Sequence, residues 1–170
     1  MLSEVFPNPV FTPDNSSWPG GEWFEVYNNT DQTVYLDNWR ISICVVSSSC
    51  RRFTVAPSKA LSVGSGDVLL FCYNANRMDD TPTPAIDCDY HYGSAFGGAT
   101  DSNYNTLFQL VNSGTAAREL SMEIDGEVVD AVDYHNTGWP SSVAAGEAYS
   151  FDGALLTGSD TDLAGGNNDY

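Results

Sequence analysis

Short runs of β-forming residues, broken by clusters of Gly, Pro, Asn, Asp and Ser, recur along the chain, while helical periodicity is nearly absent. This spacing is typical of a β-sandwich or β-barrel, because each run suits one strand and each cluster suits a turn. We therefore expect an all-β fold, specifically an antiparallel sandwich. Its strands are predicted at residues 2–6, 22–28, 33–36, 39–46, 51–55, 67–73, 107–111, 118–124, 127–134 and 147–151.

The clearest local prediction is a hairpin at Asp125-Gly126. This dipeptide suits a type I′ turn, whose two central residues both need positive φ, and apolar residues alternate on either side of it. The apolar residues of the two arms are expected to be Leu120, Met122 and Ile124 before the turn and Val128, Val129 and Val132 after it.

The composition indicates one folded domain rather than a disordered acidic segment. The chain has 170 residues, of which 42% are hydrophobic and 12% aromatic. That is enough for one compact core but hardly for two, so residues 1–170 are expected to form a single domain. Two parts depart from the strand rhythm: an irregular insert at about 74–106 and an acidic, Gly/Asn-rich tail at about 157–170. A loop as long as the insert is usually functional or held in place by some constraint.

The charge balance argues against two classes of partner. The chain has 23 Asp and Glu residues against 6 Lys and Arg, which gives a formal net charge of −17. Such a surface repels nucleic acids and anionic membranes, whose recognition depends on basic side chains. It favours solubility and acidic loops that can hold divalent cations. No apolar run of ~18 residues is present, so no transmembrane segment is expected.

Four cysteines, Cys44, Cys50, Cys72 and Cys88, indicate the compartment. They form no C-x-x-C, and the histidines lack zinc-finger spacing, so a zinc site is not expected. Three pairings are open, of which Cys44–Cys50 with Cys72–Cys88 is favoured because each bridge closes a short polar loop. Each bridge would stabilise the fold by roughly 2–3 kcal/mol. Disulfides predict an extracellular or cell-surface location. No signal peptide begins the chain, so we expect the domain to be part of a larger precursor.

No pattern of catalytic residues is present. The sequence has no G-x-S-x-G, P-loop or dinucleotide-binding glycine pattern, and neither His91 nor His135 lies in a catalytic motif. Glu22 and Glu25 lie three apart on a predicted strand, so they face opposite sides and cannot form a catalytic carboxylate pair. One of them is expected to hydrogen-bond the turn that follows. We therefore expect no enzymatic activity.

The insert contains the candidate binding residues. Four aspartates around Cys88 could supply the hard oxygen ligands that calcium prefers: Asp79, Asp80, Asp87 and Asp89. Four aromatic side chains could stack on a sugar or anchor a protein partner: Tyr90, Tyr92, Phe96 and Tyr104. The alternative for these rings is that they pack the insert against the sandwich. Residues 160–167 resemble the start of an EF-hand loop but lack its fifth-position ligand and its bidentate Glu, so an ordinary loop is favoured there.

Six segments, in order along the chain, resemble the motifs of the lamin tail domain family. They are LSEV at 2–5, GEWFEVYNNT at 21–30, VYLDNWRI at 34–41, LSVGSGDVLL at 61–70, LFQLVNSG at 107–114 and DGEVVDAVDY at 125–134. The resemblance implies an immunoglobulin-like sandwich, found in nuclear lamins and in secreted bacterial proteins, where it accompanies catalytic or surface-anchored domains. The long insert and the cysteines depart from the family pattern. The nuclear role of lamin tails is not implied, because the chain has neither a coiled coil nor a basic segment.

The sequence thus predicts a non-catalytic structural or interaction module, a lamin-tail-like accessory domain of a larger protein. Within its motifs, Trp23 and Trp39 alternate with polar neighbours and are expected on the inner faces of two strands, as core aromatics. The isolated domain is expected to be monomeric, with an unknown protein or glycan partner. The main alternative is a carbohydrate- or calcium-dependent adhesive domain that uses the insert, with calcium as its cofactor. A hydrolase with an unrecognised site is a more distant alternative.

Overall fold

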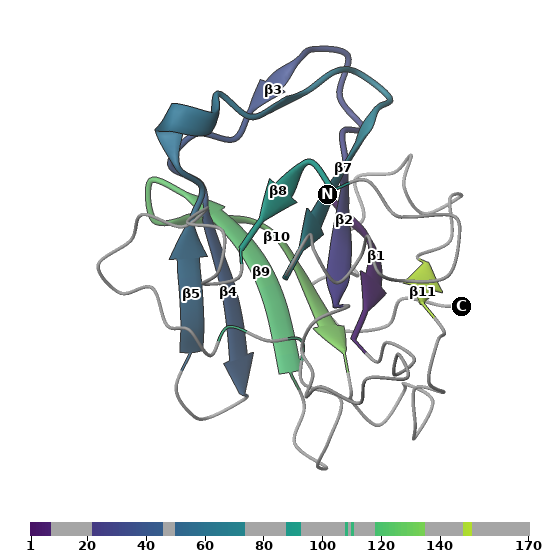
Figure 1. Cartoon of the computed structure of the whole chain (residues 1–170), viewed down its shortest axis with the longest axis vertical. Coiled ribbons are helices and arrows are strands. Elements are labelled where there is room, and N and C mark those ends of the chain that lie inside the picture. The colour runs from purple at the N-terminus through teal and green to yellow at the C-terminus, as the bar shows by residue number, and fades with distance from the viewer. Residues whose placement is uncertain are drawn as a thin grey trace, which may run out of the picture.

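The computed structural model describes residues 1–7, 22–45, 50–73, 88–92, 108, 110, 118–134 and 148–150. Their strands form two main sheets and a small third one (Figure 1). The five-stranded sheet has the order β11 (Tyr149–Ser150), β1 (Leu2–Phe6), β2 (Trp23–Tyr27), β7 (Val68–Cys72) and β8 (Tyr90–His91). The four-stranded sheet has the order β10 (Glu127–Tyr134), β9 (Arg118–Ile124), β4 (Arg40–Val45) and β5 (Cys50–Thr54).

The small sheet pairs β3 (Val34–Tyr35) with β6 (Ser62–Val63), and a single 3-10 turn, η1, covers Pro57–Lys59 between β5 and β6. β3 lies beyond the ends of the two main sheets, at the top of Figure 1. Its position follows from short backbone bonds: the Leu36 N–H donates to the Leu61 carbonyl at 2.9 Å, and the Val55 N–H donates to the Trp39 carbonyl at 2.8 Å.

One hydrophobic core lies between the two main sheets. Alternate residues of most strands point into it, as expected for a sheet with one buried face, whereas in β1 a register shift separates the core residues Leu2 and Val5 by three positions. The five-stranded sheet contributes Leu2, Val5, Phe24, Val26, Leu69 and Phe71, and the four-stranded sheet contributes Ile41, Ile43, Phe53, Leu120, Met122 and Val132. The expected all-β sandwich is therefore confirmed.

Most predicted strands are present within a residue or two of their expected ends. β1, β9 and β10 match exactly the ranges expected from the sequence. Two strands of two residues each, β6 and β8, are not among the predicted ones. The strand expected at 107–111 is described only at Phe108 and Leu110, which are buried but not in a strand.

The Asp125-Gly126 hairpin forms as predicted and joins β9 to β10. Both turn residues have positive φ, 53° at Asp125 and 86° at Gly126, as a type I′ turn requires. Beyond the turn, a bulge between Val128 and Asp130 shifts the register. Val128, opposite Glu123 on the outer face, is 59% exposed, and Val129, within the bulge, is 52% exposed, so neither belongs to the core. The bulge also makes this strand a poor template for pairing with another chain.

Trp23 does not lie on the inner face as predicted. Its neighbour Phe24 points into the main core, so Trp23 points to the opposite side of the five-stranded sheet. There it forms a second, smaller cluster with Cys72 and stacks on Phe6, with ring centroids 5.3 Å apart. Trp39 is partly buried against the main core, as expected.

The turn after β2 is held by Asn28, which is only 3% exposed. Its side-chain amide donates towards three carbonyl oxygens, at 2.7 Å to Gln32, 3.0 Å to Val63 and 3.0 Å to Gly64. Its Oδ1 accepts from the N–H and the hydroxyl of Thr30, at 3.0 and 2.8 Å. The expectation that Glu22 or Glu25 stabilises this turn was wrong, because Asn28 fills that role.

We expect Asn28→Ala to lower the free energy of unfolding by about 2 kcal/mol, because it leaves buried backbone groups without partners. Urea unfolding followed by tryptophan fluorescence would measure the change. The matched control is Gln32→Ala in the same turn, whose exposed side chain should matter by less than about 0.5 kcal/mol. Equal losses in the two variants would show that the buried amide does not hold the turn.

Candidate functional site

The middle of the long insert is fastened to the sandwich by a disulfide and by hydrogen bonds. Cys72, the last residue of β7, is bonded to Cys88, as predicted, and so is Cys44 to Cys50. Just after Cys88, the Asp89 N–H donates to the Leu70 carbonyl at 3.0 Å, and the Leu70 N–H donates to Asp89 Oδ2 at 2.8 Å. These contacts place β8 parallel to β7, whereas the other strand pairs described are antiparallel.

Tyr90 and Tyr92 belong to the core, so they do not form the binding surface expected from the sequence. Tyr90 is 2% exposed and Tyr92 is fully buried. The Tyr90 hydroxyl accepts a hydrogen bond from the Ala56 N–H at 3.2 Å, and burial raises the pKa of this phenol. Both rings stack on Phe53, with centroids 5.9 and 5.4 Å away. The alternative reading, in which the aromatic residues pack the insert onto the sandwich, is correct for these two residues.

The other members of the expected sites lie outside the described residues. These are Phe96 and Tyr104 of the aromatic set and Asp79, Asp80 and Asp87 of the calcium set. Asp89 is described, and one of its carboxylate oxygens already accepts the Leu70 N–H. Within the described residues, no three His, Cys, Asp or Glu side chains form a group that could hold a metal ion.

Calcium binding at the insert therefore stays a prediction from the sequence, with a direct test. If the four aspartates bind calcium only when the chain is folded, calcium at 100 times its dissociation constant should raise the free energy of unfolding by about 2.7 kcal/mol. Thermal melting with EDTA and with millimolar calcium would measure this. Asp79→Asn with Asp80→Asn should abolish the shift, and an unchanged midpoint in the parent protein would contradict the prediction.

Glu22 is the ionisable residue with the most unusual surroundings, and its burial was not anticipated from the sequence. It precedes β2 and is 1% exposed. Its Oε2 accepts a hydrogen bond from the Leu110 N–H at 2.8 Å, across 88 residues of sequence. Burial raises the pKa of the Glu22 carboxyl well above its usual value, and the Leu110 N–H only partly opposes that rise. A carboxyl in such a place favours the protonated form.

Two tyrosines adjoin Glu22. The Tyr73 N–H donates to the Glu22 carbonyl oxygen at 3.0 Å, and the Tyr92 hydroxyl donates to the same oxygen at 3.4 Å. Burial and then the nearby Glu22 raise the pKa of the Tyr73 phenol. The rings of Tyr73 and Tyr92 meet edge to face, 5.8 Å apart. Glu22 is thus enclosed by the ends of β7 and β8 and by Leu110.

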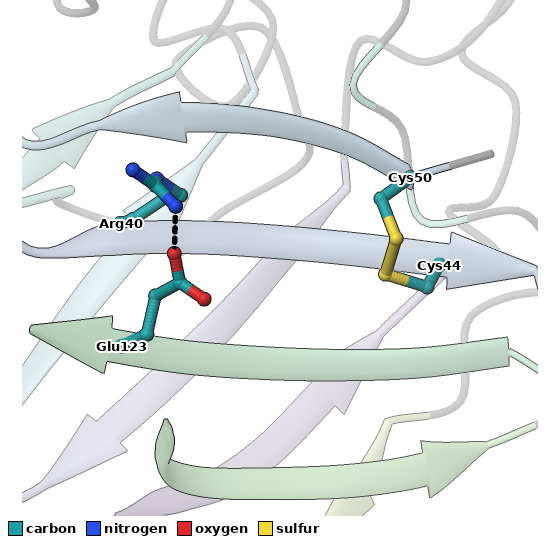
Figure 2. Close-up of polar contacts among 4 residues, drawn as sticks. All are labelled: Arg40, Cys44, Cys50 and Glu123. Carbon is teal, nitrogen blue, oxygen red and sulfur yellow. Dashed lines mark hydrogen bonds and ion pairs between the residues drawn. A yellow bond between two sulfur atoms is a disulfide. The ribbon is translucent and has the colours of Figure 1, made fainter. Parts of the chain in front are cut away.

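The outer face of the four-stranded sheet, opposite the core, carries three rows of side chains across β10, β9, β4 and β5. From the strand register these rows are Val128-Glu123-Arg40-Thr54, Ala131-Ser121-Ser42-Arg52 and Asp133-Glu119-Cys44-Cys50. Figure 2 shows two links on this sheet, the Arg40–Glu123 ion pair between β4 and β9 and the Cys44–Cys50 bridge between β4 and β5.

This outer face does not have the arrangement of a hydrolase site. Its central serines, Ser42 and Ser121, are 6% and 4% exposed and lie directly opposite each other. Their partners on the far sides are Arg52 and Ala131, so neither hydroxyl has a carboxylate or an imidazole directly opposite to activate it. The four-stranded sheet also contains four of the 6 basic residues of the chain: Arg40, Arg51, Arg52 and Arg118.

Neither a scan of protein-family models nor a search of curated proteins returned a match for this chain. Among the described residues there is also no helix of the length and hydropathy needed to cross a membrane. The proposals below therefore rest on the residues and their contacts.

Proposed function

We propose that this domain is a non-catalytic structural or interaction module, a lamin-tail-like accessory domain of a larger secreted or cell-surface protein. The main support for the proposal is that the buried polar residues of the family-like segment hydrogen-bond to the protein's own backbone. Glu22 and Asn28, which lie in the segment with the strongest family resemblance, are both buried and direct their side chains to backbone groups of the fold. Groups engaged in this way hold a scaffold together and are not presented to a substrate.

The arrangement of the motif segments supports the lamin-tail comparison. The segment 21–30 contains β2 and the turn that Asn28 closes, and 61–70 contains β6 and the start of β7. Val34 and Val63 pair across the small sheet, and 125–134 supplies the turn and the second arm of the hairpin. The resembling segments 34–41 and 61–70 therefore meet in space, which supports an immunoglobulin-like arrangement for the sandwich.

The extracellular part of the proposal is supported by the cysteines. Among the described residues no cysteine is free, and both bridges form between residues close in sequence. Such bonds persist in oxidising compartments. The gene product from which the chain derives tests the accessory role: we expect a secretion signal and a neighbouring catalytic or anchoring domain. A product that has neither and stays in a reducing compartment would contradict it.

Turnover assays test the non-catalytic part. The purified domain, with both disulfides intact, is expected to show no turnover of ester, phosphate-ester or nucleic-acid substrates beyond that of a heat-unfolded sample. An activity that co-elutes with the folded domain during gel filtration would overturn the proposal and favour the hydrolase alternative.

The adhesive alternative has lost part of its basis, because two of its four aromatic residues, Tyr90 and Tyr92, are buried. A glycan array with and without EDTA decides the rest. The accessory-domain proposal predicts no EDTA-sensitive glycan binding. Binding that disappears with EDTA and with Tyr104→Ala would favour the adhesive function instead.

A further inference from the structure

The contacts of Glu22 point to a regulatory property of the fold that is independent of any partner. Its carboxyl accepts the N–H of Leu110, a fully buried residue whose neighbour two positions earlier, Phe108, is 1% exposed. The Phe108 ring packs edge-on against Phe53 and Tyr92, with centroids 4.9 and 5.2 Å away. A single side chain before β2 thus fixes a remote stretch of chain at the point where it enters the core.

We propose that Glu22 is a proton-controlled latch: when protonated it holds Leu110 and Phe108 in the sandwich, and when ionised it loosens them. The geometric reason is that Glu22 is 1% exposed, so that solvent would stabilise a negative charge on its carboxyl poorly. The groups that act on it are the Tyr73 phenol and the Leu110 N–H, whereas the Tyr92 hydroxyl donates to the Glu22 backbone carbonyl. Within the described residues, no Lys, Arg or His acts on this carboxyl to offset a negative charge.

The direction of the pH dependence follows from the raised pKa of Glu22. At pH values between the ordinary carboxyl pKa and the raised pKa of Glu22 in the fold, the latched state binds more protons than the released state. Attachment of Leu110 is therefore strongest at acid pH and weakens as pH rises, levelling off above the folded pKa. Within that window, the equilibrium ratio of released to latched segment grows by up to tenfold per pH unit.

Amide hydrogen exchange of Leu110 measures this release. After correction for the intrinsic exchange rate, its protection should fall by up to tenfold per unit as pH rises from the ordinary carboxyl pKa to the raised pKa of Glu22. In Glu22→Gln the amide oxygen still accepts the Leu110 N–H but carries no titrating proton. Protection of Leu110 in this variant should therefore change with pH no more than the global stability of the domain does.

Two controls separate the latch from other causes. Glu25→Gln removes a nearby carboxyl that accepts from the Ser3 hydroxyl at 2.6 Å and should leave the Leu110 profile as in the parent protein. The Leu120 amide, in the middle of the four-stranded sheet, reports opening of the whole domain. Burial also raises the pKa values of Asp130 and Asp133, so global stability will drift with pH in every variant.

The proposal is overturned if Glu22→Gln keeps the pH profile of the parent protein, or if Leu110 and Leu120 lose protection equally. Should Glu22→Gln fail to fold, the carboxyl 13C shifts of the parent protein decide. A Glu22 titration midpoint well above the ordinary carboxyl pKa of about 4.3 supports the latch, and a midpoint at that ordinary value contradicts it. None of these readouts depends on the proposed function.

Discussion

Replacing Phe53 by Ala is expected to lower the free energy of unfolding by about 3–5 kcal/mol, a large part of the ~5–15 kcal/mol typical of a domain. Phe53 is fully buried in β5, at the centre of a group of aromatic rings that we call the aromatic cluster. Its ring contacts four others: Phe71, Tyr90, Tyr92 and Phe108. Truncation would remove the common neighbour of residues from β7, from β8 and from the 108–110 stretch.

The effect should be large because the cavity cannot easily close. The rings around Phe53 come from elements that are themselves fixed, Phe71 by strand pairing and Tyr90 by pairing and its hydroxyl bond to Ala56. When the surroundings relax little, the cost of the cavity adds to the lost transfer free energy. Phe53→Leu, which keeps most of the volume, should cost clearly less than Phe53→Ala.

Guanidinium unfolding of Phe53→Ala, Phe53→Leu and Tyr35→Ala would measure these effects. Tyr35 is the matched control, an aromatic residue on a short strand that is 68% exposed, and its removal should cost less than about 1 kcal/mol. If Phe53→Ala and Tyr35→Ala were equally stable, the aromatic cluster would not be the centre of the core.

Removing the Cys72–Cys88 bridge by a double substitution to Ala is expected to cost about 3 kcal/mol. The bridge closes a loop with a sequence separation of 16, and loop closure restricts the unfolded chain more strongly as the loop lengthens. Ala is chosen because Cys72 is fully buried beside Trp23, where a Ser hydroxyl would need a partner.

The second bridge provides the comparison. Cys44 and Cys50 face each other in the register of β4 and β5, with a sequence separation of only 6. The same relation gives about 2 kcal/mol for this shorter loop. Urea unfolding of the two double variants should therefore rank Cys72–Cys88 as the more costly to remove. The reverse order would mean that native-state contacts, and not loop closure, determine what each bridge contributes.

Loss of the Cys72–Cys88 bridge should also be visible locally. The Tyr92 N–H donates to the Cys72 carbonyl at 2.9 Å, just beyond the short parallel pairing of β8 with β7. A strand of two residues is too short to hold β8 in place by itself. When the bridge is absent, the Tyr92 amide should therefore exchange faster than the amides of β9. Unchanged protection of Tyr92 would show that ring packing alone is sufficient.

Sequence patterns predicted best those parts of the fold that depend on neighbours along the chain. β1, β9, β10 and the Asp125-Gly126 turn follow from alternation and from turn residues whose φ angles are known in advance. β6 and β8 were missed because each is a two-residue strand that forms by pairing with a strand elsewhere in the chain, β3 or β7. β8 exists because Cys88 and Asp89 hold it beside β7.

The candidate site was predicted less well, because it depends on which groups meet across the sandwich. The disulfide pairing was correct, since short loops favour local bridges. A tyrosine beside aspartates can equally face solvent or the core, and the structure puts Tyr90 and Tyr92 in the core. Glu22 carried one usable signal, a charged residue at the start of an apolar strand, but its partner Leu110 lies 88 residues away.

The sequence alone determined that this chain forms a disulfide-bonded β-sandwich, because strand periodicity, turn residues and short cysteine loops are local properties. The tertiary structure decided which face each side chain occupies. It turned Trp23 outward and Phe24 inward, buried Tyr90 and Tyr92 of the insert, and enclosed Glu22 beside Leu110. These outcomes depend on burial and on hydrogen bonds between distant residues, and they exist only once the two sheets have packed together.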